Sequence, residues 1–273
     1  MSTHTSRFDP QRLRRTVLQM AYAGSTVHIG CAFSIVEIMA VLYGRHLRYP
    51  GNDPQAADRD YLVLSKGHGV MAQYACMHEL GWLDDAAIQG YFSDGSELKG
   101  LSDSRVPGLE VTSGSLGHGF SVGVGLALAA KRRKSGQKTY VVVGDGEVNE
   151  GAVWEGALFA SHHDLKDFLV IVDENGFQAM GRTSEVLNLE PLARKFEAFG
   201  FETVSVDGHD EQALDRAIRA LQGSASNAPK AIIAQTVKGK GVSFMEADNR
   251  WHYTRLTAET YHQALACLAQ GEQ

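Results

Sequence analysis

Short, mainly apolar runs alternate with longer amphipathic segments over most of the chain. The short runs are typical of buried strands, and the longer segments repeat their apolar residues at helical spacing. This pattern predicts strands at residues 61–64, 139–143, 168–172, 202–206 and 231–235. It predicts helices between them at residues 70–80, 120–133, 152–162, 192–199 and 211–221. Apolar strands separated by helices indicate an α/β fold, in which helices cover both faces of a parallel sheet.

Helical patterns also precede the first strand and follow the last one. Apolar residues share one helical face over residues 13–21, and a second apolar helix is expected through residues 35–42. A final helix is predicted at residues 257–268. No repeat, low-complexity tract or proline- and serine-rich linker divides the sequence, so we expect one domain over residues 1–273.

Composition excludes several classes of protein. The formal net charge is −6, and the densest basic run, at residues 131–134, falls at the polar end of a predicted helix, so we expect no nucleic-acid binding. No apolar run approaches the roughly 20 residues that a membrane span needs. Cys31, Cys76 and Cys267 are widely spaced, which favours buried thiols in a reducing cytoplasm.

Parallel sheets bind ligands outside the carboxyl ends of their strands. Gly144-Asp145-Gly146-Glu147 directly follows a predicted strand, and such a turn is suited to binding phosphate through backbone N–H groups. Its spacing is not that of a dinucleotide-binding loop. A carboxylate inside the turn would repel phosphate unless a divalent cation lies between them, so Asp145 is a candidate metal ligand. The alternative for Asp145 is a simple turn residue.

The next predicted strand ends in further oxygen donors at the same edge of the sheet. Asn175 offers a side-chain oxygen and Phe177 a backbone carbonyl. With Asp145, two phosphate oxygens and a water, they would complete the six oxygen ligands of Mg²⁺. An Asn-Gly turn is the alternative reading of Asn175.

Asn175 lies 30 positions after Asp145, and the two resemble the GDG…N fingerprint of thiamine diphosphate enzymes. Nearly the whole chain resembles the N-terminal, diphosphate-binding domain of the transketolase family. The resemblance rests on further segments at residues 64–69, 111–117, 144–151 and 238–242. It implies a thiamine-diphosphate-binding fold with thiamine diphosphate and Mg²⁺ as cofactors.

The resemblance also implies roles for individual residues. Cofactor contacts are implied for His68, Gly114, Ser115, Leu116, Gly144, Asp145, Gly146, Glu147 and Asn175. Catalytic roles are implied for His28, His68, His252 and Glu150, with Glu150 as an acid at a subunit interface. Imidazoles that are neutral near pH 7 suit the proton transfers of ketol transfer.

Other polar residues keep two interpretations. Glu147 and Asn149 also suit a role in capping the following helix. His118 either begins a helix or contacts substrate. His162 and His163 are adjacent at a helix end, so they face different ways and are expected to be solvated.

Two departures from the family pattern change the expected function. Residues 99–103 stand where transketolases carry a Gly-His-Pro element, and no histidine occurs between His78 and His118, so we expect an unusual sugar substrate. The chain is also shorter than a complete transketolase. The resemblance therefore implies a separate subunit with the pyrimidine-binding domain and the glutamate that activates the cofactor, in an α₂β₂ assembly.

We therefore predict a cytoplasmic, two-component transketolase-like transferase, which moves a two-carbon ketol unit from a ketose or ketose phosphate to an aldose. Three alternatives remain. The first is the α-subunit of a 2-oxo-acid dehydrogenase E1 component, which shares the GDG…N site. The second is an enzyme similar to deoxyxylulose-phosphate synthase. The third is a cofactor-binding assembly subunit without catalytic activity, against which the retention of Asp145, Asn175 and the histidines speaks.

Overall fold

Five parallel strands form the central sheet of the computed structural model, which describes residues 8–270. Their spatial order is β1, β2, β3, β7, β6, and every neighbouring pair is parallel. The bounds are β1 Tyr61–Leu64, β2 Thr139–Gly144, β3 Phe168–Glu174, β6 Glu202–Asp207 and β7 Lys230–Gln235. The α/β fold with a parallel sheet is thus confirmed, and each strand lies where the apolar pattern predicted it.

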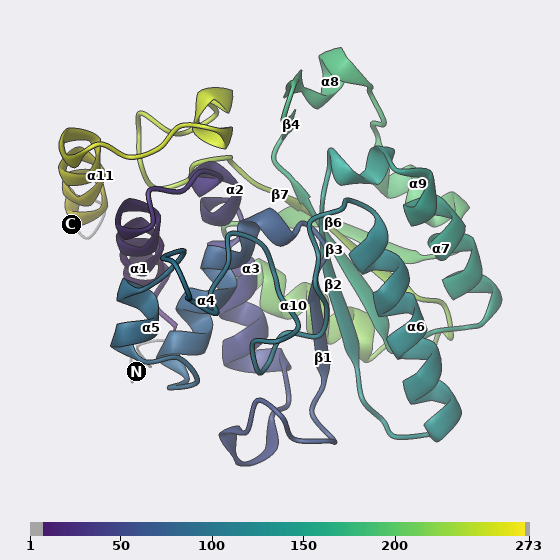
Figure 1. Ribbon diagram of the computed structural model, residues 1–273. Helices are drawn as coiled ribbons and strands as arrows, with labels where there is room; N and C mark the ends of the chain where they lie inside the picture. Colours follow the sequence, from purple (N-terminus) through teal and green to yellow (C-terminus); the bar gives the residue numbers. More distant parts are fainter. Residues whose placement is uncertain (1–7, 271–273) are drawn as a thin grey trace, which may run out of the picture.

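Helices cover both faces of this sheet (Figure 1). Odd-numbered residues of β2, such as Val141 and Val143, pack with the helices α6, α7 and α9, whereas Tyr140 and Val142 face the opposite layer. The first layer consists of α6 His118–Arg133, α7 Gly151–His162 and α9 Leu192–Ala198. The opposite layer includes α1 Pro10–Ala23, α3 Val36–Val41, α4 Val70–Glu79, α10 Glu211–Gln222 and α11 Ala258–Gln270. The alternating side-chain direction of a strand explains why both faces are apolar.

Several helix boundaries follow from local chemistry. Asp9 caps α1 by accepting a hydrogen bond from the backbone N–H of Gln11, and Pro10 occupies the first turn. Asp210 caps α10 in the same way, through the N–H groups of Gln212 and Ala213. The helix predicted at residues 120–133 begins at His118, directly after Gly117.

The segment at residues 29–46 differs from its prediction. Instead of one helix through residues 35–42, the chain forms α2 Ile29–Phe33, then α3, then a π-helical turn at Leu42–His46. Every residue from Ile29 to Tyr43 is buried, so the apolar spacing does not reveal where the helix breaks. Three short elements were also not predicted: α5 Asp85–Gln89, α8 Thr183–Val186, and the hairpin of β4 Phe177–Gln178 with β5 Gly181–Arg182.

The topology brings distant loops together. The segments that follow β1, β2, β3 and β7 all leave the sheet at its carboxyl edge, because the four strands are parallel neighbours. The hairpin β4–β5 and α8 project from the same edge (Figure 1). Across residues 8–270, no helix has both the length and the apolar composition needed to cross a membrane.

Candidate active site

A cavity of about 620 Å³ opens at the carboxyl edge of the sheet. It contains nearly all of the residues singled out in the sequence. These are His28, His68, Gly114, Leu116, Gly144, Asp145, Gly146, Glu147, Glu150, Asn175, Phe177 and His252. Ser115 is exposed and does not line the cavity, and neither does His118, which lies exposed in the first turn of α6.

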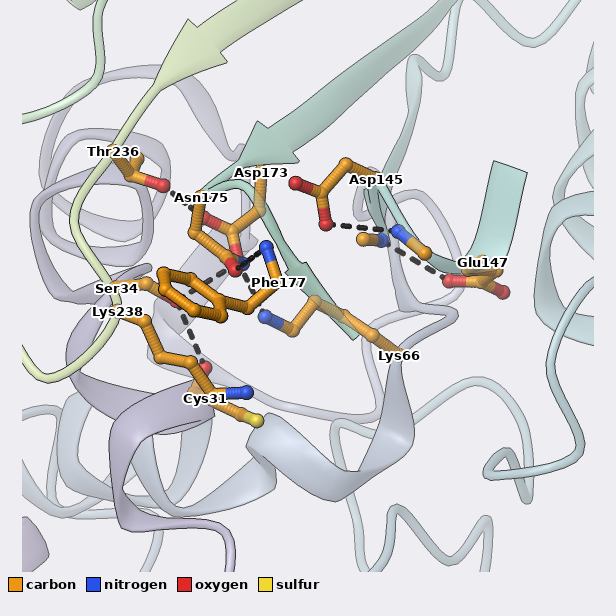
Figure 2. A network of polar contacts seen from close by, with 12 residues as sticks. Cys31, Ser34, Lys66, Asp145, Glu147, Asp173, Asn175, Phe177, Thr236 and Lys238 are labelled. Carbon is orange, nitrogen blue, oxygen red and sulfur yellow. Dashed lines mark hydrogen bonds and ion pairs between the residues drawn. The ribbon is translucent and has the colours of Figure 1, made fainter. Parts of the chain in front are cut away.

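Asp145 lies at the end of β2 with 4% of its surface exposed. Its carboxylate accepts backbone hydrogen bonds from Gly146 (2.8 Å) and Gly176 (2.6 Å), which orient it toward the loop after β3 (Figure 2). Burial and the charge of Asp173 raise the pKa of Asp145 to about 7. A cation beside this carboxylate would offset the cost of its buried charge, so the site suits a metal ligand.

The side chain of Asn175 is oriented by two hydrogen bonds. Its Nδ2 donates to Asp173 Oδ2 (2.8 Å), and its Oδ1 accepts from the backbone N–H of Phe177 (3.1 Å). Because a carboxylate accepts only, the Asp173 contact determines which end of the amide carries oxygen. One lone pair of Oδ1 stays available, so Asn175 fits the role of a second oxygen ligand.

Asp173 is fully buried and organises the loops around it (Figure 2). It accepts hydrogen bonds from Lys66 Nζ (2.5 Å), Ser34 Oγ (2.8 Å), the Asn175 amide and Thr236 Oγ1. Burial alone raises the pKa of Asp173, but the charge and the hydrogen bond of Lys66 outweigh it, so the net shift is downward. The sequence analysis assigned no role to Asp173 or Lys66. The one signal was their place at strand ends, within segments that carry other site residues.

Glu147 is buried and its carboxylate binds three donors of the protein. They are Ser65 Oγ, the backbone N–H of Gly117 (2.8 Å) and the backbone N–H of Gly144 (3.3 Å). These contacts join the loop after β1, the start of α6 and the end of β2. Glu147 therefore holds the cofactor-facing loops together, and its side chain caps α6 rather than α7.

Three histidines from separate segments meet in the cavity. The ring centroids lie 5.2 Å apart for His28 and His68, 5.1 Å for His28 and His252, and 5.6 Å for His68 and His252. His28 adopts a left-handed conformation (φ 71°) directly before α2, which is unusual for a residue with a side chain. Its backbone N–H donates to the carbonyl of His252 (3.1 Å), so the two segments are connected directly. Strained residues held this way are concentrated at functional sites.

The three imidazoles are neutral at physiological pH. Burial, followed by the charges of Lys238 and Lys66, lowers the pKa of His28 to about 4. Burial and Lys238 lower the pKa of His252 to about 3, and burial and Lys66 hold the pKa of His68 well below its usual value. Lys238 Nζ lies 2.9 Å from His252 Nδ1 and donates to it, so the ring proton of His252 is on Nε2.

These shifts predict a titration result. In the isolated chain, the ring resonances of His28, His68 and His252 are expected to stay unchanged from pH 8 down to about pH 5, because burial and nearby ammonium groups disfavour protonation. The unfolded chain takes up these protons near pH 6.5. The folded state therefore loses stability as the pH falls below that value. Histidine-selective NMR at a series of pH values tests this, and a midpoint above pH 6 for any of the three would contradict it.

The loop after β7, which carries Lys238, is held by a buried network. Arg14 donates to the carbonyl of Lys240 (2.8 Å) and pairs with Glu37 (2.7 Å). His209 binds Glu37 through Nδ1 (2.9 Å) and accepts from the backbone N–H of Val237 through Nε2 (2.8 Å). The position of Lys238 beside His252 thus depends on helices far away in the sequence.

The comparisons with known proteins agree with this geometry. Residues 12–268 match the family model of the thiamine diphosphate-binding domain of transketolase. The chain belongs to the transketolase family. The expected α-subunit of a 2-oxo-acid dehydrogenase is therefore the less favoured assignment, and the predicted recognition of a thiamine-diphosphate-binding transketolase domain is confirmed.

The relatives of this transketolase domain include proteins of similar length. It is 36% identical to one subunit of the apulose-4-phosphate transketolase of Phocaeicola vulgatus, over 97% of this chain and 94% of that one. It is 38% identical to the 6-deoxy-6-sulfo-D-fructose transketolase subunit SqwG of a Clostridium species, over 88% of each chain. Human transketolase is 35% identical, but the match covers 38% of that protein. This chain thus corresponds to one such subunit of a transketolase-type transferase.

Solved transketolases share the fold. The crystal structure of the transketolase from Campylobacter jejuni superposes with a TM-score of 0.89 at 28% sequence identity. The superposition covers 98% of this chain and 43% of that one. The sheet and its two helical layers are therefore those of the transketolase thiamine diphosphate-binding domain.

Proposed function

We propose that this chain is the cofactor-binding subunit of a two-component transketolase, which transfers a two-carbon ketol unit from a ketose or ketose phosphate to an aldose. The observation that carries the proposal is the composition of the cavity. It places two prospective metal ligands, Asp145 and Asn175, in one cavity with three neutral histidines. The high coverage of relatives that are themselves transketolase subunits supports the same assignment.

Mg²⁺ fits the oxygen donors at the carboxyl ends of β2 and β3. Asp145 and Asn175 would bind it through side chains and Phe177 through its backbone carbonyl, and the ion would hold the cofactor diphosphate. When bound, thiamine diphosphate supplies the electron sink that ketol transfer needs. Backbone groups at Gly114, Ser115, Leu116, Gly144 and Gly146 would position it, together with Glu147 and His68.

The histidines suit the proton transfers of this reaction. A ketose donor loses a hydroxyl proton as its carbon–carbon bond breaks, and the acceptor aldehyde gains one. A neutral imidazole can take up or release a proton near pH 7. His28, His68 and His252 would serve as these groups, and the Nε2 proton of His252 is available as a donor. Glu150 lies beside them at the cavity wall, where we assign it to the contact with the partner subunit.

Exposed apolar side chains around the cavity support a partner subunit. Leu101, Met180, Val186 and Leu187 all line the cavity, yet Met180 is 78% exposed and Leu187 is 56% exposed. A contiguous apolar rim of this kind is typical of an interface. We propose that a separate subunit with the pyrimidine-binding domain covers it and supplies the activating glutamate, in an α₂β₂ assembly. The three unpaired cysteines support a cytoplasmic location.

The wall of the cavity supports an unusual sugar substrate. Leu101 occupies the region where the family carries a histidine, and it packs over the cofactor-facing loop. A Cβ on Gly114 would lie 2.9 Å from Leu101 Cδ1, so Gly114 is needed for this approach. An apolar side chain here cannot bind a substrate hydroxyl. Two relatives are named for apulose-4-phosphate and 6-deoxy-6-sulfo-D-fructose, which accords with a substrate outside the common pentose phosphates.

Reconstitution tests the proposal. The chain is co-expressed with the partner that co-purifies with it, and ketol transfer is measured with thiamine diphosphate, Mg²⁺ and a panel of ketoses and aldoses. We expect turnover from the complex and none from the isolated chain. Tight cofactor binding and turnover by the isolated chain would contradict the two-component assignment. Activity with a 2-oxo acid and a lipoyl protein, without ketol transfer, would instead favour the dehydrogenase alternative.

A further inference from the structure

A second cavity, of about 330 Å³, lies next to the active-site cavity and shares two of its walls. His28 and Leu101 line both cavities. The remaining walls come from residues 25–27, Phe92, residues 99–100 and Arg255. A substrate held at the three histidines therefore has its far end directed either to bulk solvent or into this second cavity.

The second cavity is built from closely packed and strained backbone. Ser25, His28 and Phe92 all have positive φ, at 46°, 71° and 61°. The segment before Ser25 packs tightly against Phe92, since a Cβ on Gly24 would lie 2.8 Å from the carbonyl oxygen of Tyr91 and 2.9 Å from Phe92 Cβ. Surrounding structure must hold such conformations in place, and they are concentrated at binding sites. The cavity is thus a defined part of the fold.

Its charge is opposite to that of the whole chain. Of the described residues that line it, Lys99 and Arg255 are cationic and none is acidic, although the chain carries a net charge of −6. Arg255 Nε donates to the carbonyl of Ser25 (2.8 Å), which fixes the guanidinium at the wall. Within residues 8–270 its two terminal nitrogens have neither a hydrogen-bond acceptor nor an ion pair. Lys99 binds the carbonyl of Ser96 and, over the same residues, also has no carboxylate partner.

We propose that this cavity binds the anionic terminal group of the sugar substrate, through Arg255 and Lys99. A guanidinium with two free nitrogens presents donors to two oxygens of a phosphate or sulfonate, and Lys99 adds a second positive charge. Val27, Phe92 and Leu101 enclose the carbon chain and exclude water, which strengthens the charge interactions. This inference rests on the proposed ketol transfer at the neighbouring cavity, because it assigns the substrate class of that site: sugars that end in a phosphate or a sulfonate.

Binding of a ligand that cannot react tests the site without turnover. The probe is a pentitol phosphate, which has no carbonyl group, measured by calorimetry on the reconstituted complex. Its sulfonate analogue and the uncharged pentitol are measured in parallel, to separate the two anionic groups. We expect Arg255→Gln and Lys99→Gln each to weaken the binding of an anionic probe by about tenfold or more, since hydrogen bonds to charged groups contribute about 1.5–3 kcal/mol. The binding of the uncharged pentitol is expected to stay the same.

Two further variants keep the result specific. Arg255→Lys retains the charge and is expected to recover part of the affinity. Lys134→Gln removes an exposed cation at the end of α6, at the opposite edge of the sheet, and is expected to have no effect. Unchanged binding of the anionic probes by Arg255→Gln would overturn the proposal. An equal loss for charged and uncharged probes, with weaker partner binding, would overturn it in favour of a subunit contact.

Turnover then separates this inference from the proposed function. With an anionic ketose, Arg255→Gln is expected to raise KM with little change in kcat, as for a residue that binds substrate away from the reacting atoms. If the complex binds the anionic pentitol through Arg255 but transfers no ketol unit from any sugar, the binding site stands and the proposed function fails. If ketol transfer occurs and KM does not respond to Arg255→Gln, the proposed function stands and the anion site fails.

Discussion

Asp145→Ala in the reconstituted enzyme is expected to reduce Mg²⁺-dependent ketol transfer to background. Loss of a residue that only supports a metal ligand typically costs about 10–100-fold in metal affinity. Loss of a direct ligand that also bridges the ion to the diphosphate should therefore cost at least about a hundredfold. The measurement is turnover as a function of Mg²⁺ and of thiamine diphosphate. Unchanged turnover would exclude metal ligation by Asp145 and would favour an assembly subunit without chemistry.

Thermal denaturation separates this effect from a folding defect. In the absence of cation, the buried carboxylate of Asp145 is costly to the folded state, as its raised pKa indicates, so the variant without cofactor is expected to be at least as stable as the parent chain. Addition of Mg²⁺ and thiamine diphosphate should raise the Tm of the parent chain but not of the variant, because only a bound ligand stabilises the fold. Asp58→Ala, in the exposed loop before β1, is the matched control and should behave like the parent chain.

Asp173→Asn is expected to destabilise the fold by about 3–5 kcal/mol, because it leaves the Lys66 ammonium buried without a counter-charge. Lys66 is 2% exposed and Asp173 is fully buried, so water cannot replace the lost partner. The variant should also weaken cofactor binding, since Asp173 orients the Asn175 amide. Urea denaturation of the isolated chain measures the first effect, and a Mg²⁺ titration of the complex measures the second.

A double variant identifies the cause of this loss. Lys66→Met removes the buried ammonium, so Lys66→Met combined with Asp173→Asn is expected to recover part of the stability that Asp173→Asn alone loses. Cofactor binding should not recover, because an Asn at position 173 no longer determines the orientation of Asn175. A double variant that is as unstable as the sum of both single variants would show that the pair acts independently.

The elements whose local signals agreed were predictable from sequence. The strand at residues 139–143 is a continuous apolar run, and α10 combines an Asp cap with apolar residues at helical spacing. In contrast, the breaks between α2, α3 and the π-helical turn lie inside a segment that is buried throughout, so periodicity could not locate them. The hairpin β4–β5 has two residues in each strand, which is too short to leave a pattern.

The sequence by itself determined the fold class, the edge of the sheet that binds the cofactor, and the residues at strand ends that suit a metal and a diphosphate. It could do so because strand periodicity and the GDG…N spacing are local signals, and parallel strands bring their carboxyl ends to one edge. Asp173, Lys66 and the common environment of the three histidines were decided by the tertiary structure alone. Their chemistry depends on burial and on charges that arrive from distant segments, and neither quantity is encoded in the spacing of residues along the chain.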